Sequence, residues 1–188
     1  MIFENAVTFV HRILRDVIPQ RSVVIDATMG NGWDTALMAG LVGEGGIVYG
    51  FDIQQVALEV TSTRISETSA DVRLLLCSHE EMALHIEPEH HGKVCAVTFN
   101  LGYLPGGDKD VTTHAETTRR AIEAARTLLA PGGVITIVCY RHAEGQKELE
   151  TIRSLLATWP QDATACTETM FLNQVGNPPV VFVVVARS

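Results

Sequence analysis

Nearly continuous blocks of apolar residues alternate along the chain with segments in which apolar side chains recur every three or four positions. The block Val72-Arg73-Leu74-Leu75-Leu76 is typical of a parallel strand covered on both faces. The spacing of Val7, Val10 and Leu14 indicates a helix that buries one face. The pattern predicts strands over residues 22–27, 47–52, 72–77, 94–99, 134–140, 164–170 and 179–186. It predicts helices over residues 3–17, 33–42, 55–68 and 144–159, a short one between residues 78 and 88, and one between the fourth and fifth strands.

Local signals mark where several helices begin and end. Pro19 stops the first helical pattern, and Gly43 can cap the helix over residues 33–42 in the left-handed conformation. Thr113-His114-Ala115-Glu116 has the spacing of a capping box, so it predicts the start of the helix before the fifth strand. Pro131-Gly132-Gly133 predicts its end, ahead of a strand that starts at residue 134.

Strands that alternate with helices and are followed by two closing strands predict an open, mostly parallel seven-stranded sheet with helices on both faces. The last run, Val180 to Val185, is apolar on alternate faces, so it is an inner strand or one covered by a partner. The sequence leaves both choices open, and with them a homodimer.

Polar residues gather directly after the first five predicted strands. These clusters are residues 28–34, 52–54, 78–80, 100–109 and 140–142. In open sheets of this kind, ligands bind at the carboxyl ends of the strands, where the winding reverses. We therefore expect all five clusters to lie on one edge of the sheet and to form the functional site.

The glycine-bearing turn after the first strand, with the second strand ending in Asp52, predicts a cofactor with a ribose. A dinucleotide fingerprint would continue Gly30-Asn31-Gly32 with a third glycine, but Thr35 stands there. A Walker loop needs a lysine, and the first lysine of the chain is Lys93. The interpretation that remains is S-adenosylmethionine, with its amino acid end over the glycine turn and its ribose at Asp52, which implies methyl transfer.

Composition narrows the class of protein. The 188 residues are 46% hydrophobic and carry a net charge of −8, which argues against general affinity for nucleic acid unless a local basic patch exists. Two groups could form such a patch: Arg119, Arg120 and Arg126 on one predicted helix, and Lys109, Arg141 and His142 after strand ends. The alternative is that the helix arginines lie on a solvated face. No secretion signal or membrane-length apolar run is visible, so we expect a cytoplasmic protein. The four cysteines stand far apart without metal-ligand spacing, which predicts buried strand thiols and no metal site.

Four segments of the chain resemble the YtqB-like family, whose members are labelled rRNA methylases. They are residues 26–35, 51–54, 100–109 and 173–179, and the run Asn100-Leu-Gly-Tyr-Leu-Pro-Gly-Gly-Asp-Lys109 is specific to that family. The resemblance implies one class I (Rossmann-like) methyltransferase domain over residues 1–188 with an antiparallel closing strand. It also implies that the substrate is the exocyclic amine of 5-aminomethyluridine, or its 2-thio form, at the wobble position of tRNA. The loop 140–145 departs from the family pattern.

Asn100 and Tyr103 have the spacing of the Asn-Pro-Pro-Tyr loop of amino methyltransferases, so they are candidates for a clamp on an amine and for stacking on a base. Asp34 could face the cofactor or the amine, and the resemblance places His79 and Glu80 beside the adenine. The catalytic candidates are Asn100, Tyr103, Asp34 and His142. The cofactor candidates are Asp26, Thr28, Met29, Gly30, Asn31, Gly32, Asp34, Thr35, Asp52, Ile53, Gln54, Ser78, His79, Glu80, Asn100, Leu101 and Gly102. The substrate candidates are Tyr103, Pro105, Lys109, His114, Tyr140, Arg141 and His142.

Several other functions stay open on the sequence. The same fold with NAD would make an oxidoreductase, although Thr35 speaks against it. A module that binds RNA without catalysis would use the same surface. Within the methyltransferases, ribosomal RNA, a small amine or a protein amine are alternative substrates.

Overall fold

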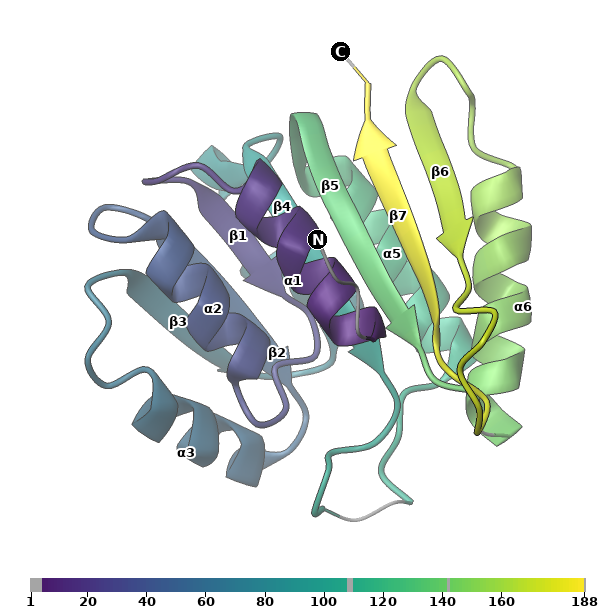
Figure 1. Cartoon of the computed structure of the whole chain (residues 1–188). Helices are drawn as coiled ribbons and strands as arrows, with labels where there is room; N and C mark the ends of the chain where they lie inside the picture. Colours follow the sequence, from purple (N-terminus) through teal and green to yellow (C-terminus); the bar gives the residue numbers. More distant parts are fainter. Residues whose placement is uncertain (1–4, 108–109, 142, 188) are drawn as a thin grey trace.

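Seven strands form one sheet in the computed structural model, which describes residues 5–107, 110–141 and 143–187 (Figure 1). The order across the sheet is β3-β2-β1-β4-β5-β7-β6. All neighbours from β3 to β5 pair in parallel, whereas β7 is antiparallel to both β5 and β6, so the predicted fold with its antiparallel closing strand is confirmed. The strands are β1 (Val23–Asp26), β2 (Ile47–Asp52), β3 (Asp71–Leu76), β4 (Val94–Leu101), β5 (Leu129–Cys139), β6 (Thr164–Thr169) and β7 (Val180–Ala186).

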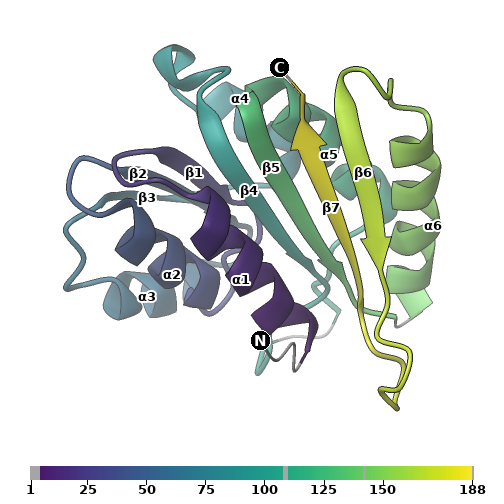
Figure 2. The same ribbon diagram turned by 45° about the horizontal axis from the view of Figure 1, so that its top comes forward.

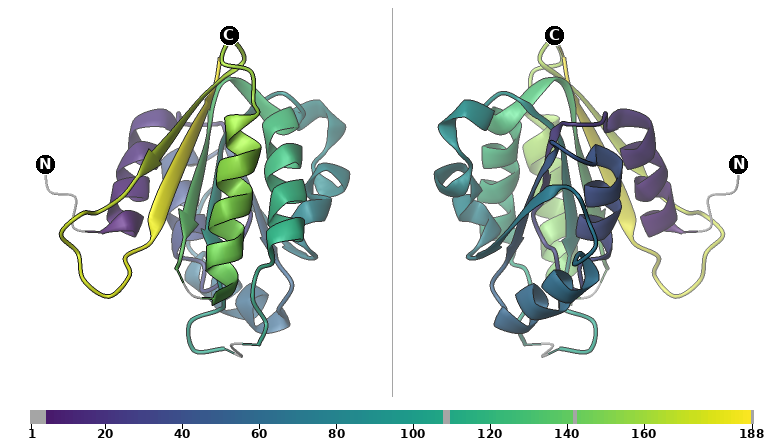
Figure 3. Two further views of the ribbon diagram at one scale, coloured as in Figure 1. Left: turned by 90° about the vertical axis from the view of Figure 1, so that its right-hand side faces the viewer. Right: turned by 90° about the vertical axis from the view of Figure 1, so that its left-hand side faces the viewer.

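Helices cover both faces of the sheet (Figures 2 and 3). One face carries α1 (Ala6–Val17), α2 (Trp33–Val42) and α3 (Gln55–Arg64), and the other carries α4 (Met82–His85), α5 (Ala115–Leu128) and α6 (Ala143–Ala157). Short 3₁₀ turns, η1 (His79–Glu81) and η2 (Pro88–His90), flank α4. Successive strand residues point to opposite faces, so the sheet divides the interior into two apolar clusters. Val24 packs with the α1 and α2 residues, and its neighbour Ile25 packs with those of α5 and α6.

The apolar run at the end of the chain is an inner strand. β7 lies between β5 and β6, so both of its edges are paired and Val180, Val181 and Val184 are buried. The edge position belongs to β6, whose Glu168 binds Arg153 of α6 in an ion pair. Charged and polar side chains of this kind protect an edge strand from pairing with other chains.

Two element boundaries and one helix cap differ clearly from the expectation. The helix expected over residues 55–68 ends at Arg64. β5 begins at Leu129, which pairs with Val94, while Val134 pairs with Ala96. Residues 130–133 therefore form a bulge within β5, and Pro131-Gly132-Gly133 does not separate a helix from a strand. Gly43 has φ +60° and ψ −159°, which differs in ψ from the left-handed cap that was expected.

The capping box is also wrong. His114 is the N-cap of α5, and its side chain makes no capping hydrogen bond. The Thr113 hydroxyl accepts the Gly102 N–H at 2.9 Å and donates to Glu148 Oε2 at 3.0 Å. Because these longer-range partners use the hydroxyl, Thr113 ties the loop after β4 to α6 and does not cap α5.

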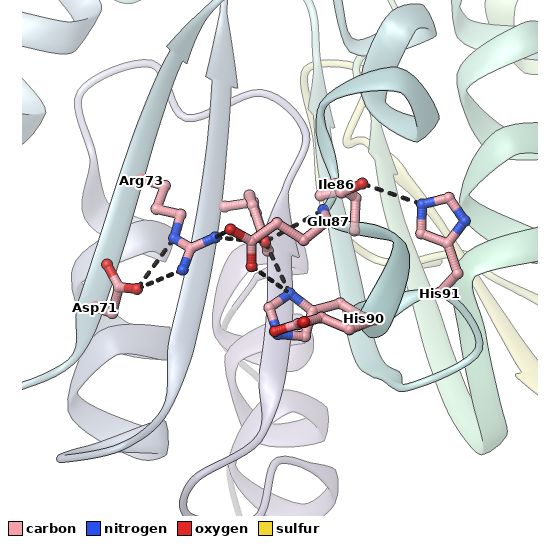
Figure 4. A network of polar contacts seen from close by, with 8 residues as sticks. Asp71, Arg73, Ile86, Glu87, His90 and His91 are labelled. Atoms are coloured by element: carbon pink, nitrogen blue, oxygen red, sulfur yellow. Dashed lines mark hydrogen bonds and ion pairs between the residues drawn. The ribbon is translucent and has the colours of Figure 1, made fainter.

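A polar network holds the connection between α4 and β4 against the sheet (Figure 4). Arg73 of β3 donates to Tyr49 Oη at 2.9 Å and forms ion pairs with Asp71 and Glu87, each at 2.8 Å. Tyr49 Oη also lies 2.8 Å from His90 Nδ1 of η2, and burial raises the pKa of Tyr49. The buried Tyr49 hydroxyl and the buried His90 ring thus have polar partners, which removes the cost of burying them alone.

The cysteines only partly follow the expectation of buried thiols. Cys139 is buried, and this burial raises the pKa of its thiol to about 12. Cys77 and Cys95 are half-buried, and Cys166 is exposed on the edge strand β6. Among the described helices, none has the length and apolar character needed to cross a membrane.

Candidate active site

A cavity of about 490 Å³ lies at the carboxyl edge of the sheet, at the lower edge in Figure 1, where the loop after β4 extends beyond the strands. Its size falls within the usual range for cofactor sites. Side chains from the ends of β1, β2, β3, β4 and β5 line it, as the common position of the polar clusters predicted. The candidates that line it are Thr28, Met29, Gly30, Asn31, Asp34, Asp52, Ile53, Gln54, Ser78, His79, Asn100, Leu101, Gly102, Tyr103, Pro105, His114 and Tyr140.

The turn after β1 is organised by Asp26, which is fully buried behind the cavity wall. Asp26 accepts the Thr35 hydroxyl at 2.6 Å and the Thr28 N–H at 3.3 Å. Burial, followed by the charge of Asp34, raises the pKa of Asp26 to about 7. Gly32 has φ +76°, and a Cβ there would lie 2.6 Å from Thr61 Oγ1, so glycine is required for both conformation and space.

Asp52 lies at the end of β2 and closes the same turn from the other side. Its Oδ2 accepts the Gly30 N–H at 3.0 Å and its Oδ1 accepts the Gln54 N–H at 2.9 Å. Burial raises the pKa of this carboxyl group. Each carboxylate oxygen has a second lone pair, so Asp52 can still accept hydrogen bonds from two hydroxyl groups of a ligand in the cavity.

A buried histidine follows β3. Burial lowers the pKa of His79 to about 4, so its ring is neutral at physiological pH. The ring lies edge-on to Phe99, with centroids 5.9 Å apart. The next residue, Glu80, is absent from the cavity wall and instead pairs with Arg120 of α5 at 2.7 Å. His79 is thus a neutral polar group beside the cavity, whereas Glu80 links two elements of the scaffold.

Asp34, Asn100 and His11 form a connected group at the other end of the cavity. Asn100 donates its side-chain N–H to Asp34 Oδ2, and His11 Nε2 of α1 lies 2.5 Å from Asp34 Oδ1. The Asn100 backbone N–H is fixed by the Thr28 hydroxyl at 2.7 Å. The side-chain oxygen of Asn100 is buried and has no hydrogen-bond partner among the described residues. This atom is therefore an acceptor available to a ligand.

The loop after β4 covers this end of the cavity. Tyr103 and Thr112 face each other in an isolated antiparallel bridge, and Thr113 holds Gly102 through its hydroxyl. Asn31 donates its side-chain N–H to the Pro105 carbonyl at 3.2 Å, which joins this loop to the glycine turn. The loop therefore contacts the glycine turn that is predicted to hold the cofactor.

Not every candidate residue reaches the cavity. Asp26, Gly32, Thr35 and Glu80 lie behind its wall, and Arg141 is exposed outside it. Lys109 and His142 lie outside the described residues. On α5, Arg119 and Arg120 pair with carboxylates and Arg126 stacks over Trp159 at 4.8 Å. These contacts favour a solvated helix face over a basic patch.

Several contributions to the site were missed. Val7 and Trp33 are among the lining residues that were not candidates, and His11 touches Asp34. Trp33 is 65% exposed and stacks under the Arg64 guanidinium at 3.3 Å. His11 stands four positions after Val7, within the apolar stripe of its helix, so the signal was a polar residue on a face predicted to be buried. The spacing analysis also missed that Cys77 gathers with Glu81 and His85 at the surface, a group to which we assign no role.

Known proteins resemble this chain in sequence and in fold. Residues 48–185 match the protein family described as "Putative rRNA methylase". The chain is 38% identical over 190 residues to a tRNA (mnm(5)s(2)U34)-methyltransferase, chloroplastic, of Arabidopsis thaliana, covering 95% of this chain and 69% of that protein. A "putative rRNA-methylase" of Clostridium thermocellum is 36% identical with a TM-score of 0.93, covering 99% of this chain and 100% of the other.

A third relative was solved with a ligand. A "putative methyltransferase" of Streptococcus mutans, solved in complex with SAH, is 30% identical to this chain with a TM-score of 0.87, and the match covers 98% of this chain and 99% of the other. Structures with lower identity, such as an O-methyltransferase of Bacillus cereus in complex with SAH, share the fold at a TM-score of 0.67. The cofactor of these methyltransferases is S-adenosylmethionine, and it is the cofactor of this chain as well. The chain belongs to this rRNA methylase family of class I methyltransferases.

Proposed function

We propose that this protein methylates the exocyclic amine of 5-aminomethyluridine, or of its 2-thio form, at the wobble position of tRNA. The product is the 5-methylaminomethyl nucleoside. The observation that carries the proposal is the buried side-chain oxygen of Asn100, which has no hydrogen-bond partner among the residues that the structure describes. It lies beside the Asp34 carboxylate, at the cavity end covered by the β4 loop. The choice of tRNA is supported by the Arabidopsis relative, whose name gives the same class of reaction.

The polar groups at this end suit an amine better than a hydroxyl or a ring carbon. An alkylamine with a pKa near 10.4 is largely protonated at neutral pH, so it must lose a proton and then offer its lone pair. Asn100 Oδ1 can accept one N–H and so orient the lone pair, and removal from water in the cavity favours the neutral form of the amine. The Asp34 carboxylate next to Asn100 is a base that can take up the released proton. We infer that the Asn100 amide and the Leu101 carbonyl hold the nitrogen.

The residues at the glycine turn fit the cofactor. Asp52 retains acceptors for the ribose hydroxyls, neutral His79 stands at the base end, and the turn at Gly30 leaves room for the amino acid end. When bound, S-adenosylmethionine supplies a methyl group on a positively charged sulfur. The task of the chain is then to align the amine, and alignment of two reactants can lower a barrier by roughly 7 to 11 kcal/mol.

Exposed aromatic rings surround the mouth of the cavity. Trp33 is 65% exposed, Tyr103 is 41% exposed and Tyr140 is 40% exposed, and all three line the cavity. Aromatic faces stack on bases without regard to sequence. We infer that these rings hold the target uridine and its neighbour, which gives an acidic chain an affinity for RNA that does not depend on a basic patch. All of these groups lie at the carboxyl edge of one sheet, in keeping with one catalytic domain over residues 1–188.

Nucleoside analysis of a deletion strain tests the proposal. Total tRNA and ribosomal RNA are digested, and their nucleosides are quantified by mass spectrometry. Accumulation of aminomethyluridine species, reversed by the wild-type gene, is the expected result. Unchanged tRNA with a missing methyl group in ribosomal RNA would replace the proposal with an rRNA substrate. If no nucleoside changes, and the protein binds RNA with the same affinity with and without the cofactor, the result would favour a non-catalytic RNA-binding module.

A further inference from the structure

His11 contacts the active site from an element that takes no other part in the chemistry. Its helix, α1, packs on the sheet face that also carries α2, and His11 Nε2 reaches Asp34 Oδ1 at 2.5 Å. The Asp34 side chain is 7% exposed and that of His11 is 20% exposed, so water screens this pair weakly. The roles proposed for Asp34 and Asn100 do not by themselves explain why His11 contacts Asp34.

The contact determines how Asn100 is oriented. A carboxylate only accepts hydrogen bonds, so both Asp34 oxygens require donors: Oδ1 takes the N–H of His11 and Oδ2 takes the amide N–H of Asn100. If the Asn100 amide were turned over, its oxygen would face the carboxylate, and two acceptors would repel each other. The amide nitrogen is therefore held toward Asp34, and the amide oxygen, unpartnered among the described residues, is held away from it.

We propose that His11 is a positioning residue of the methyl-transfer site. By donating its Nε2–H to Asp34 Oδ1, it keeps Oδ2 turned to Asn100 and so presents Asn100 Oδ1 to the nitrogen that receives the methyl group. Without that donor, the carboxylate is free to rotate or to take up water, and the Asn100 amide loses its fixed orientation. The inference rests on the proposed function only in that the accepting group is an amine.

Binding of sinefungin tests the inference without any RNA. Sinefungin resembles the cofactor but has an amine-bearing carbon in place of the methylsulfonium group, so its ammonium can donate to Asn100 Oδ1. A hydrogen bond to a charged donor contributes enough free energy to change affinity by about tenfold or more. The measured quantity is the ratio of dissociation constants for SAH and sinefungin, obtained by calorimetry on the full chain.

Three variants give the design. His11→Leu should lower the preference for sinefungin over SAH by about tenfold while SAH affinity stays within about twofold. His11→Gln, whose amide can donate from nearly the place of Nε2, should recover most of the preference. His91→Leu is the control, because His91 contacts the Ile86 carbonyl (Figure 4) and does not line the cavity. A sinefungin preference in His11→Leu equal to that of the wild type would overturn the proposal, and so would equal losses of affinity for both ligands.

Kinetics separate this inference from the proposed function. On tRNA that carries 5-aminomethyl-2-thiouridine, His11→Leu should reduce the single-turnover rate by about tenfold or more at saturating S-adenosylmethionine, with KM for the cofactor unchanged and rescue by His11→Gln. A purely structural defect would lower cofactor affinity as well, and glutamine would not rescue it. If the wild-type protein fails to modify this tRNA, the proposed function is wrong, and the sinefungin ratio still decides the role of His11.

Discussion

Replacing Gly32 by alanine should weaken the cofactor turn through two effects that can be measured separately. Gly32 has φ +76°, and an L-residue in this left-handed region costs roughly 1–2 kcal/mol. The new Cβ would also lie 2.6 Å from Thr61 Oγ1 and 2.9 Å from Thr61 Cα. Because one of these atoms is backbone, rotation of the Thr61 side chain cannot relieve the clash, and overpacking of this kind costs typically about 1–3 kcal/mol.

Gly92→Ala is the matched control. Gly92 also has a positive φ, +72°, but a Cβ there has no atom within 4 Å. The control therefore measures the backbone effect alone, about 1–2 kcal/mol. Urea unfolding should show Gly32→Ala to be less stable than Gly92→Ala by at least about 1 kcal/mol. The clash also displaces Thr61, which donates to the Gly30 carbonyl at 3.2 Å, so SAH affinity should fall in Gly32→Ala only. Equal stability losses, or normal SAH binding by Gly32→Ala, would refute this reasoning.

Three further predictions concern buried polar groups. Because the pKa of Asp26 is raised to about 7 from the ~3.9 of the unfolded chain, the native state binds the extra proton between these values. Relative to Asp26→Asn, the wild type should therefore lose unfolding free energy as pH rises from 5 to 7, by up to about 1.4 kcal/mol per pH unit, in urea titrations; a constant difference would contradict this. Asp52→Ala should weaken SAH binding at least about tenfold in calorimetry, and unchanged affinity would exclude the ribose contact. Tyr49→Phe leaves Arg73 and His90 without a shared partner, so it should cost about 1–3 kcal/mol in urea unfolding without affecting SAH affinity, and a fall in that affinity would show that the network reaches the site.

The carboxyl edge of the sheet could be predicted because its signals are local. Asp52 is the last residue of one apolar strand, and the glycine turn follows another. The ends of the two strands are therefore enough to locate Asp52 and the turn. In a parallel sheet these ends lie on one edge, which is why the polar clusters at Asn100 and Tyr140 line the same cavity. The apolar composition of β7 indicated an inner strand or one covered by a partner, and the structure shows the inner strand.

What the sequence could not show depends on contacts between distant elements. Thr113 has the sequence spacing of a capping residue, but its hydroxyl forms hydrogen bonds with Gly102 and Glu148 instead. Glu148 lies within reach only because α5 packs on α6. β5 extends back to Leu129 because Val94 offers a pairing partner, and the bulge absorbs the glycines. His11 meets Asp34 across 23 positions through the docking of α1, which no local periodicity encodes.

The central claim, transfer of a methyl group to an amine of tRNA, is tested most directly with purified components. The wild-type chain is incubated with S-adenosylmethionine labelled with deuterium in its methyl group and with tRNA that carries 5-aminomethyl-2-thiouridine, and the nucleosides are analysed by mass spectrometry. The account predicts that the label appears in 5-methylaminomethyl-2-thiouridine. Label found only in ribosomal RNA offered in the same mixture, or in no RNA at all, would contradict it.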